Sequence, residues 1–358
     1  MKKIILLLLL LIPLKTMAID TSATSSILMD IDSNRILYEE NIHNVRSVAS
    51  ISKIMTAVIA IESGKLDDKV TIGSEISKSY GSGIYIKEGE ILTLRDLLYG
   101  LMLRSGNDAA LAIAHYVGGS VNEFVKLMNN KARELKMTNT TFNNPSGLDQ
   151  DKGNYSTAYD MALLTSYAMK LDDYKTITGT KKYTLKTNKN TYVWINKNKL
   201  LSLYKYSTGG KTGFTEIAKR TLVTTASKDG INLVVVTLND GNDWQDHQNL
   251  FEYGFNNYTN IKLLKKGNIN IYNEQYYEYY DLYVKNNFNY LVGNNEEDSV
   301  IFKYKLEKLR KIKNKDKVGK VEIYIGEEKI HEESIFIKEK EKEKKSVFLK
   351  FKEWIFSL

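Results

Sequence analysis

Apolar residues recur at helical spacing in the stretch that follows Ser50. A helix drawn over residues 50–62 is apolar on nearly every face, with its larger side chains at Ile51, Ile54, Met55, Val58 and Ile59. Gly64 ends the pattern. Because a helix that is apolar all round is a buried one, we predict a central helix whose N-terminus lies near Ser50.

The same periodicities predict the elements around this helix. Thr93 and Asp96 form a capping pattern in front of an apolar stripe that ends near Arg104. Further helices are expected over residues 109–117, 124–135 and 159–171. Alternation and turn residues predict a hairpin over 26–38, strand character over 183–194, and a second hairpin that joins 222–226 to 233–237. Glycine-flanked Lys211 and Thr212 are expected on a strand beside that second hairpin.

The composition changes after residue 258, and the chain from 265 onward is rich in Tyr, Lys and Asn. Alternating stretches at 300–305 and 321–325 predict a small antiparallel β domain. We therefore divide the chain into a larger domain over 19–262, a β domain over 263–337 and a terminal segment over 338–358. That segment begins with a Lys/Glu run, expected to be a solvated spacer.

The two ends of the chain carry membrane signals. Residues 1–18 combine two lysines, a short apolar run and small residues before Ala18, which predicts a cleaved secretion signal; an uncleaved anchor is the alternative. Residues 346–358 place aromatic and aliphatic side chains on one helical face beside lysines. This pattern favours an amphipathic helix that binds a membrane surface, and the alternative is a helix docked on the β domain.

Composition excludes some classes of chemistry. The chain has no cysteine, so disulfides, thiol catalysis and a lipidated N-terminal cysteine are excluded. The net charge of +8 is spread along the sequence and lies partly in the leader, which indicates a solvated surface, and we expect no nucleic-acid partner.

Ser50 and Lys53 form the first candidate chemical pair. One helical turn separates them, so the lysine amine can reach the serine hydroxyl. A serine is activated in this way only if the lysine loses its proton, through burial or through a second cation nearby. Ser202 and Lys205 have the same spacing, but no apolar helix follows them, and we discard that pair.

Two further motifs are individually weak. Ser105-Gly-Asn107 links two predicted helices, where an ordinary capped turn is the simplest explanation. Lys211-Thr-Gly213 is rich in glycine, but it lacks the first glycine of a phosphate-binding loop and precedes strands instead of a helix.

Together the three motifs resemble the signatures of penicillin-binding proteins and serine β-lactamases. Short sequence segments at and between these motifs are similar to those of the low-molecular-mass D-alanyl-D-alanine carboxypeptidases, at residues 49–56, 103–110, 144–149, 155–158 and 210–215. The resemblance covers about 27–258. It implies an α+β fold in which a mostly antiparallel sheet is flanked by helices, followed by a small all-β domain and a C-terminal amphipathic helix, and it requires neither metal nor cofactor.

The resemblance also implies roles for single residues. Ser50 is the expected nucleophile toward the terminal D-Ala-D-Ala bond of the peptidoglycan stem peptide, and Lys53 is its general base. Ser105 relays a proton to the leaving amine, and Asn107 orients the substrate amide and the lysine. β-Lactams are expected to acylate the same serine, as covalent inhibitors.

The remaining motif residues are expected at the substrate. Lys211 attracts the substrate carboxylate and lowers the pKa of Lys53, and Thr212 hydrogen-bonds that carboxylate. Gly213 completes the motif, and the backbone N–H of Phe214 forms an oxyanion hole with that of Ser50. Lys197 falls where the family can have an arginine that binds the substrate carboxylate. A lysine binds a carboxylate as a point charge, without the two parallel hydrogen bonds of a guanidinium group.

Other departures and rival functions stay open at this point. Ser146 stands where the family often has histidine, and Thr208 lies close to where it often has aspartate. The rivals are a serine β-lactamase and a catalytically silent, wall-binding scaffold. A Ser-His-Asp hydrolase is disfavoured, because the four histidines lie outside the motifs and no Gly-x-Ser-x-Gly occurs. The resemblance and the leader together imply an enzyme on the outer face of the cytoplasmic membrane.

Overall fold

The computed structural model of the 358-residue chain describes residues 19–149, 152–272 and 274–340. The chain divides into two compact units, one that ends at Asn256 and one that begins at Asn257. This division falls somewhat before the sequence-based domain limit at residues 262/263. The predicted leader over 1–18 and the predicted amphipathic helix over 346–358 lie outside the described residues.

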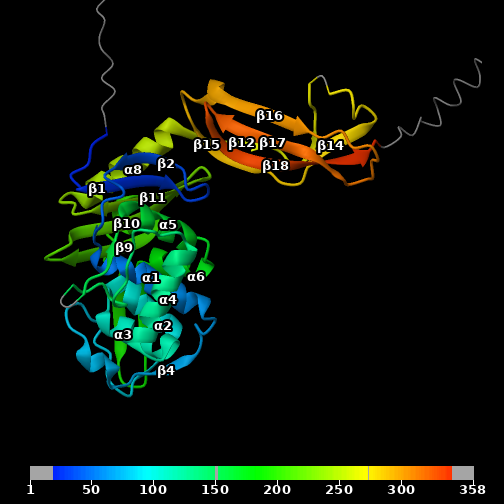
Figure 1. Cartoon of the computed structure of the whole chain (residues 1–358). Coiled ribbons are helices and arrows are strands. Elements are labelled where there is room, and N and C mark those ends of the chain that lie inside the picture. The colour runs from blue at the N-terminus through cyan, green and yellow to red at the C-terminus, as the bar shows by residue number, and fades with distance from the viewer. Residues whose placement is uncertain (1–18, 150–151, 273, 341–358) are drawn as a thin grey trace, which may run out of the picture. The chain divides into compact units, whose positions relative to one another are not determined.

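A five-stranded antiparallel sheet forms the centre of the first unit, in the order β2-β1-β11-β10-β9 (Figure 1). The strands are β1 (Ser25–Asp30), β2 (Ile36–Glu40), β9 (Ser207–Thr215), β10 (Lys219–Lys228) and β11 (Ile231–Leu238). Both predicted hairpins are confirmed, since β1 pairs with β2 and β10 pairs with β11. The predicted strand around Lys211 is confirmed as β9, which pairs with β10.

Both faces of this sheet are covered by helices (Figure 1). On one face, Met29 of β1 accepts a hydrogen bond from Ser166 of α5 (Ala158–Ala168). On the other face, Gly254 of α8 (Asp243–Asn257) packs closely on the sheet, where a Cβ would lie 2.7 Å from Leu233 and 3.0 Å from Leu28. Because successive residues of a strand face opposite sides, β1 is buried along its whole length.

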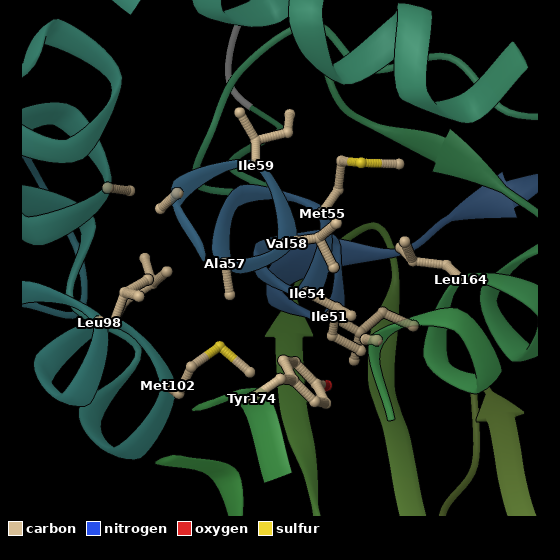
Figure 2. Packing of buried hydrophobic residues seen from close by; sticks show 14 of the residues in the cluster. Ile51, Ile54, Met55, Ala57, Val58, Ile59, Leu98, Met102, Leu164 and Tyr174 are labelled. Atoms are coloured by element: carbon tan, nitrogen blue, oxygen red, sulfur yellow. The ribbon is translucent and has the colours of Figure 1, made fainter. Parts of the chain in front are cut away.

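The helix α1 (Lys53–Glu62) is the buried central helix that the apolar pattern predicts. Figure 2 shows its side chains surrounded by Leu98 and Met102, by Leu164 and by Tyr174, which come from three other helical segments. The helix ends at Glu62, before Gly64, as expected. Burial on every side fixes the N-terminus of α1, and therefore the position of Ser50, relative to the rest of the unit.

The predicted helices are confirmed, with boundaries shifted by a few residues. Thr93 and Asp96 form the predicted capping box of α2 (Leu94–Tyr99), which continues as a π-helical turn, η3 (Gly100–Arg104). The other helices are α3 (Asn107–Gly118), α4 (Val121–Glu134), α6 (Asp172–Gly179) and α7 (Leu200–Leu203), with 3-10 turns η1 (Ala49–Ser52) and η2 (Ser74–Lys78). Short hairpins and ladders pair β3 (Arg46–Ser47) with β6 (Tyr155–Ser156), β4 (Lys69–Thr71) with β5 (Ile91–Thr93), and β7 (Lys182–Lys186) with β8 (Thr191–Ile195).

The second unit is built from antiparallel strands, as predicted. One sheet has the order β13-β14-β18-β17-β16, and a separate ladder pairs β12 with β15. The strands are β12 (Tyr258–Leu264), β13 (Gly267–Ile269), β14 (Tyr280–Val284), β15 (Phe288–Gly293), β16 (Val300–Leu306), β17 (Lys317–Ile325) and β18 (Glu328–Glu339), with a 3-10 turn η4 (Glu297–Ser299). Residues 338 and 339 therefore continue a strand, although the charge run predicted a spacer from 338.

Among the described residues, no helix combines the length and the apolar character needed to cross a membrane. The mixed helix and sheet architecture of the first unit and the all-β second unit agree with the predicted α+β fold class.

Candidate active site

Ser50 lies in the 3-10 turn η1, immediately before α1. Its Oγ is 3.0 Å from Nζ of Lys53, which donates to it, and 3.4 Å from the carbonyl oxygen of Ser146. Ala49, just before it, has a φ of 47°, in the left-handed region that a residue with a side chain rarely adopts. The contact between hydroxyl and amine that the Ser-x-x-Lys spacing predicts is therefore present.

Lys53 is fully buried, yet its amine contacts only neutral oxygens. Besides Ser50 Oγ, Nζ donates to Asn107 Oδ1 at 2.7 Å and to the Ser146 carbonyl. Burial, followed by the positive charges of Lys211 and Lys197, holds the pKa of Lys53 well below its usual range, and the negative charge of Asp108 only partly opposes this. A lysine in this state gives up its proton far more readily than one in water.

The second motif lies where η3 meets α3. Ser105 is nearly buried and has a φ of 63°, and Asn107 is the first residue of α3. Asn107 Nδ2 donates to the carbonyl of Tyr80 at 2.7 Å, which fixes the amide so that Oδ1 faces Lys53. The left-handed turn at Ser105 ends one helix and starts the next, and the start of α3 places Asn107 beside Lys53.

A tight loop over residues 143–149 supplies a contact that the motif analysis missed. The backbone N–H groups of Ser146 and Gly147 donate to Asn144 Oδ1, and Thr56 of α1 donates to the carbonyl of Pro145 at 2.7 Å. Gly147 has a φ of 82°, and a Cβ there would lie 2.0 Å from the Ala49 carbonyl oxygen. Only glycine allows this approach, which places the Ser146 carbonyl beside Lys53.

The Ser146 hydroxyl itself points away from the lysine, since it donates to Asn144 Oδ1 at 3.0 Å. The main chain of this residue therefore makes the contact with Lys53. A histidine at this position, as the family often has, is not needed for it. The only signal in the sequence was the Asn-Pro-Ser-Gly turn, which does not reveal which atom faces the site.

The third motif lies on the edge strand β9, against the turn that carries Ser50. A Cβ on Gly213 would be 3.0 Å from the backbone nitrogen of Ser50, so the glycine permits close approach of the two backbones. Lys211 is almost fully buried, and its Nζ donates to the Thr212 carbonyl at 2.7 Å. Burial and the charge of Lys197 lower the pKa of Lys211 to about 7.

Lys197 follows β8, and its positive charge contributes to the lowered pKa values of Lys53 and Lys211. Its Nζ donates to Ser82 Oγ at 3.3 Å, and burial together with the charge of Arg104 lowers its own pKa. The Phe214 side chain is largely exposed, so the predicted use of this residue rests on its backbone N–H. Thr208 lies on β9 before the Lys-Thr-Gly motif, and its hydroxyl is hydrogen-bonded to the hydroxyl of Thr225 on β10 at 2.7 Å.

Asp149 links the turn that carries Ser50 to the strand β9 through hydrogen bonds. Its carboxylate accepts hydrogen bonds from Ser47, before the nucleophile turn, and from Thr215, at the end of β9. Because both bonds go to hydroxyls, the carboxylate is committed to the scaffold and does not neutralise Lys53 or Lys211. No role for Asp149 was predicted from the sequence.

The histidines do not enter the site. His247 is fully buried between the hydroxyls of Thr224 and Thr237, and burial lowers its pKa to about 3. Over residues 19–149, 152–272 and 274–340, no group of three or more His, Cys, Asp or Glu side chains could hold a metal ion.

Comparison with known protein families assigns both units. A model described as D-alanyl-D-alanine carboxypeptidase, of the S11 class of serine peptidases, matches residues 13–242. A model described as the penicillin-binding protein 5 C-terminal domain matches residues 258–343. The chain belongs to the D-alanyl-D-alanine carboxypeptidase family, as the three motifs predicted, and the class of enzyme is a serine-type carboxypeptidase.

Individual relatives agree with this assignment. The chain is 34% identical over 261 residues to the D-alanyl-D-alanine carboxypeptidase DacF of Bacillus subtilis, covering 70% of this chain and 67% of that protein. It is also 34% identical over 259 residues to DacC of Escherichia coli, covering 68% and 64%. Penicillin-binding protein 5 of Haemophilus influenzae has a similar structure, with a TM-score of 0.75 at 27% identity over 89% of this chain and 97% of that one.

Proposed function

We propose that the protein removes the terminal D-alanine from peptidoglycan stem peptides that end in D-Ala-D-Ala, through an acyl-enzyme on Ser50. The observation that carries this proposal is the 3.0 Å contact between Ser50 Oγ and Lys53 Nζ, at a lysine that is buried and has a strongly lowered pKa. Such a lysine can accept the serine proton near neutral pH, which an ordinary lysine cannot.

In the first half of the reaction, Lys53 accepts the proton of Ser50 while Oγ attacks the carbonyl carbon of the scissile bond. The backbone N–H groups of Ser50 and Phe214 stabilise the negative charge on the carbonyl oxygen. The C–N bond then breaks as Ser105 gives its proton to the nitrogen and takes the proton that Lys53 holds. D-alanine leaves, and Lys53 is neutral again. Asn107 keeps Lys53 oriented, which its 2.7 Å hydrogen bond supports.

In the second half, Lys53 accepts a proton from the water that attacks the ester carbonyl carbon. Lys53 returns this proton to Ser50 Oγ as the carbon–oxygen bond breaks, which regenerates both residues. The carboxylate of the substrate is held by Lys211, Thr212 and Lys197. The two lysines support this role because neither pairs with a carboxylate in the described residues. Their charge is available to a ligand.

The test uses the purified chain with diacetyl-L-lysyl-D-Ala-D-Ala and measures released D-alanine. We expect Ser50→Ala to lower the rate by at least about a thousandfold. Ser202→Ala is the matched control, because Ser202 has a lysine at the same spacing but is exposed on α7, and this variant should keep the wild-type rate. Equal release by wild type and Ser50→Ala, or no release by wild type, would refute the proposal.

We also propose that β-lactams acylate Ser50 and are released slowly. In the described residues, no carboxylate hydrogen-bonds to Ser50 or Lys53, and the Ser146 carbonyl occupies the place beside them. Without a carboxylate base, water is poorly activated for fast hydrolysis of the adduct. A penicilloyl adduct should persist for minutes or longer by mass spectrometry. Rapid turnover of penicillin would instead favour the β-lactamase alternative.

Export and attachment to the outer face of the cytoplasmic membrane are proposed from the sequence patterns at residues 1–18 and 346–358. Deletion of 346–358 should move the protein from the membrane fraction to the soluble fraction. Sedimentation that does not change would refute the anchor.

A further inference from the structure

A cavity of about 610 Å³ opens beside the candidate active site. Asn107 and Ser146, the two residues that hold Lys53 together with Ser50, belong to its wall. The cavity therefore begins at the reacting groups and extends away from them.

The walls of the cavity are partly apolar. Leu111 of α3, Val121 of α4 and Leu148 of the 143–149 loop contribute the aliphatic side chains. Polar groups of Asn143 and Asn144 line the rest, although the Asn144 amide is occupied by the turn that it stabilises. A side chain with a methylene stem would bury apolar surface here, at roughly 25 cal/mol per Å².

Two lysines, Lys78 and Lys152, also belong to the lining. Both are exposed, and neither forms an ion pair with another described residue. Of the described residues that line this cavity, none is acidic. A partly apolar cavity with two lysine ammonium groups that form no ion pair with described residues is complementary to a ligand with an apolar stem and an anionic end.

The position of the cavity relates it to one part of the substrate. Lys211 and Lys197 hold the terminal carboxylate in the proposed function, on the side of β9 and of the segment after β8. The cavity lies between α3 and the 143–149 loop. Its wall includes Asn107 and Ser146, which contact Lys53, but does not include Lys211, Thr212 or Lys197. A peptide with its carboxylate at Lys211 and its scissile bond at Ser50 directs the preceding residue toward this cavity.

We propose that the cavity binds the side chain of the residue before D-Ala-D-Ala, and that this side chain carries an apolar stem ending in a carboxylate, which Lys78 and Lys152 attract. The inference rests on the proposed function and names its substrate class more narrowly. The cavity is expected to favour substrates in which the residue before D-Ala-D-Ala has an acidic side chain over those in which this side chain is neutral.

The test compares two substrates that differ by one charge. They are N-acetyl-α-aminopimelyl-D-Ala-D-Ala and the corresponding peptide with its side-chain carboxylate converted to the primary amide. We expect kcat/KM of the wild-type chain for the acid to exceed that for the amide by about tenfold at low salt, and the ratio to fall toward one in 0.5 M NaCl. D-Alanine release is the readout for both.

Substitutions of Lys78 and Lys152 test whether the acid-to-amide ratio of kcat/KM depends on the cavity. Lys78→Gln and Lys152→Gln should each lower the acid-to-amide ratio by about threefold and leave kcat/KM for the amide unchanged, whereas Lys78→Arg and Lys152→Arg should keep the ratio. Lys186→Gln removes the same charge from the exposed strand β7 and serves as the matched control. A structural effect of either substitution would alter both substrates equally and would not move the ratio.

A second pair of substrates separates the side-chain carboxylate from a main-chain one. In this pair Nε-acetyl-lysine precedes D-Ala-D-Ala, and a γ-linked D-glutamyl residue before it carries its α-carboxyl group either free or as the amide. We expect these two to be cleaved with equal kcat/KM, and a preference that depends on Lys78 and Lys152 in this pair alone would overturn the assignment to the side chain.

The outcomes separate the two levels of the argument. A wild-type acid-to-amide ratio of about one, or a ratio that neither glutamine variant changes, would overturn the inference while release of D-alanine still supports the proposed function. Release from none of the four peptides would overturn both.

Discussion

Charge is handled in opposite ways in the two units of the molecule. In the first unit, Lys53 and Lys211 are buried, contact only neutral oxygens, and have lowered pKa values. In the second unit, Glu322 on β17 lies within ion-pair distance of Lys305, Lys320 and Lys329. Hydrogen bonds from Lys305 and Lys320 lower the pKa of Glu322 to about 2.

The difference in charge pairing distinguishes groups that can exchange protons near neutral pH from groups that stabilise the fold. A paired charge, such as Glu322, keeps its ionised form over a wide pH range and has no tendency to exchange protons near neutrality. An unpaired buried lysine is held close to the point at which it gives up its proton, and the folded state is less stable as a result. The first unit therefore accepts a cost in stability at the place where a base is needed.

The largest effect should come from removing the base. Lys53→Gln retains a hydrogen-bonding group but cannot accept the Ser50 proton, so release of D-alanine should fall by about a hundredfold to ten-thousandfold. Glu322→Gln, which also exchanges a charged group for an amide, should leave the rate within about twofold. A Lys53→Gln variant with more than a tenth of the wild-type rate would contradict the assignment of this lysine as base.

The next effect concerns stability. Lys211→Met removes a desolvated ammonium group, so the free energy of unfolding should rise by about 1–2 kcal/mol at pH 7 while activity is lost. The folded pKa of Lys211 is about 7 and the unfolded value is about 10.4, so the unfolded chain binds more protons between these limits. As the pH rises through this window, the free energy of unfolding of the wild type should therefore increase relative to that of Lys211→Met, and the difference between the two proteins should shrink.

Urea unfolding at pH 7 and pH 10, followed by the fluorescence of Trp194 and Trp244, measures this difference. Lys186→Met, on an exposed strand, is the control and should show no such pH dependence. If Lys211→Met is less stable than wild type at pH 7, desolvation does not dominate at this lysine.

A third effect should appear in the pH profile. The charge of Lys197 lowers the pKa of both Lys211 and Lys53, so Lys197→Gln should move the rising limb of acylation to higher pH, by about half a unit to one unit. Lys197→Arg keeps the charge and should leave the limb in place. The rate of penicilloyl adduct formation against pH gives the limb directly, and identical limbs for wild type and Lys197→Gln would show that Lys197 does not act on the base.

The smallest effect is expected at Glu322. Because its folded pKa lies below its unfolded value, the carboxylate stabilises the fold above about pH 4.5, and this contribution disappears as the pH falls toward 2. Glu322→Gln should slightly lower the unfolding midpoint of the second unit at pH 7, less so in high salt, and should not change it at pH 2. A decrease that persists at pH 2 would mean that packing, and not charge, stabilises this position.

Periodicity predicted most elements of the first unit because their burial follows simple rules. The helix after Ser50 is apolar all round and is buried all round, and the capping residues of α2 were visible as Thr93 and Asp96. The sequence did not predict α6 or α8, whose stripes are interrupted by polar residues such as Asp246 and His247 that are buried in the structure. Buried polar residues depend on partners distant in sequence, which no local pattern contains.

The same limit applies to the site. The three motifs were found from the sequence, and their resemblance to a family predicted which residues would meet. The contribution of the Ser146 carbonyl could not be predicted, because it depends on how closely Gly147 approaches Ala49, and every residue has a carbonyl. The lowered pKa of Lys211 likewise depends first on burial and then on the charge of Lys197, which is separated from Lys211 in the chain by α7.

The register of the central sheet has a consequence for the order of events during synthesis. Ser25 at the start of β1 pairs with Leu238 at the end of β11, so the sheet cannot close until more than two hundred residues have emerged. Contacts of such long range form slowly, after local helices and hairpins. Lys53 and Lys211 have lowered pKa values because they are buried in the folded unit, so the activation of Ser50 depends on contacts of this long range.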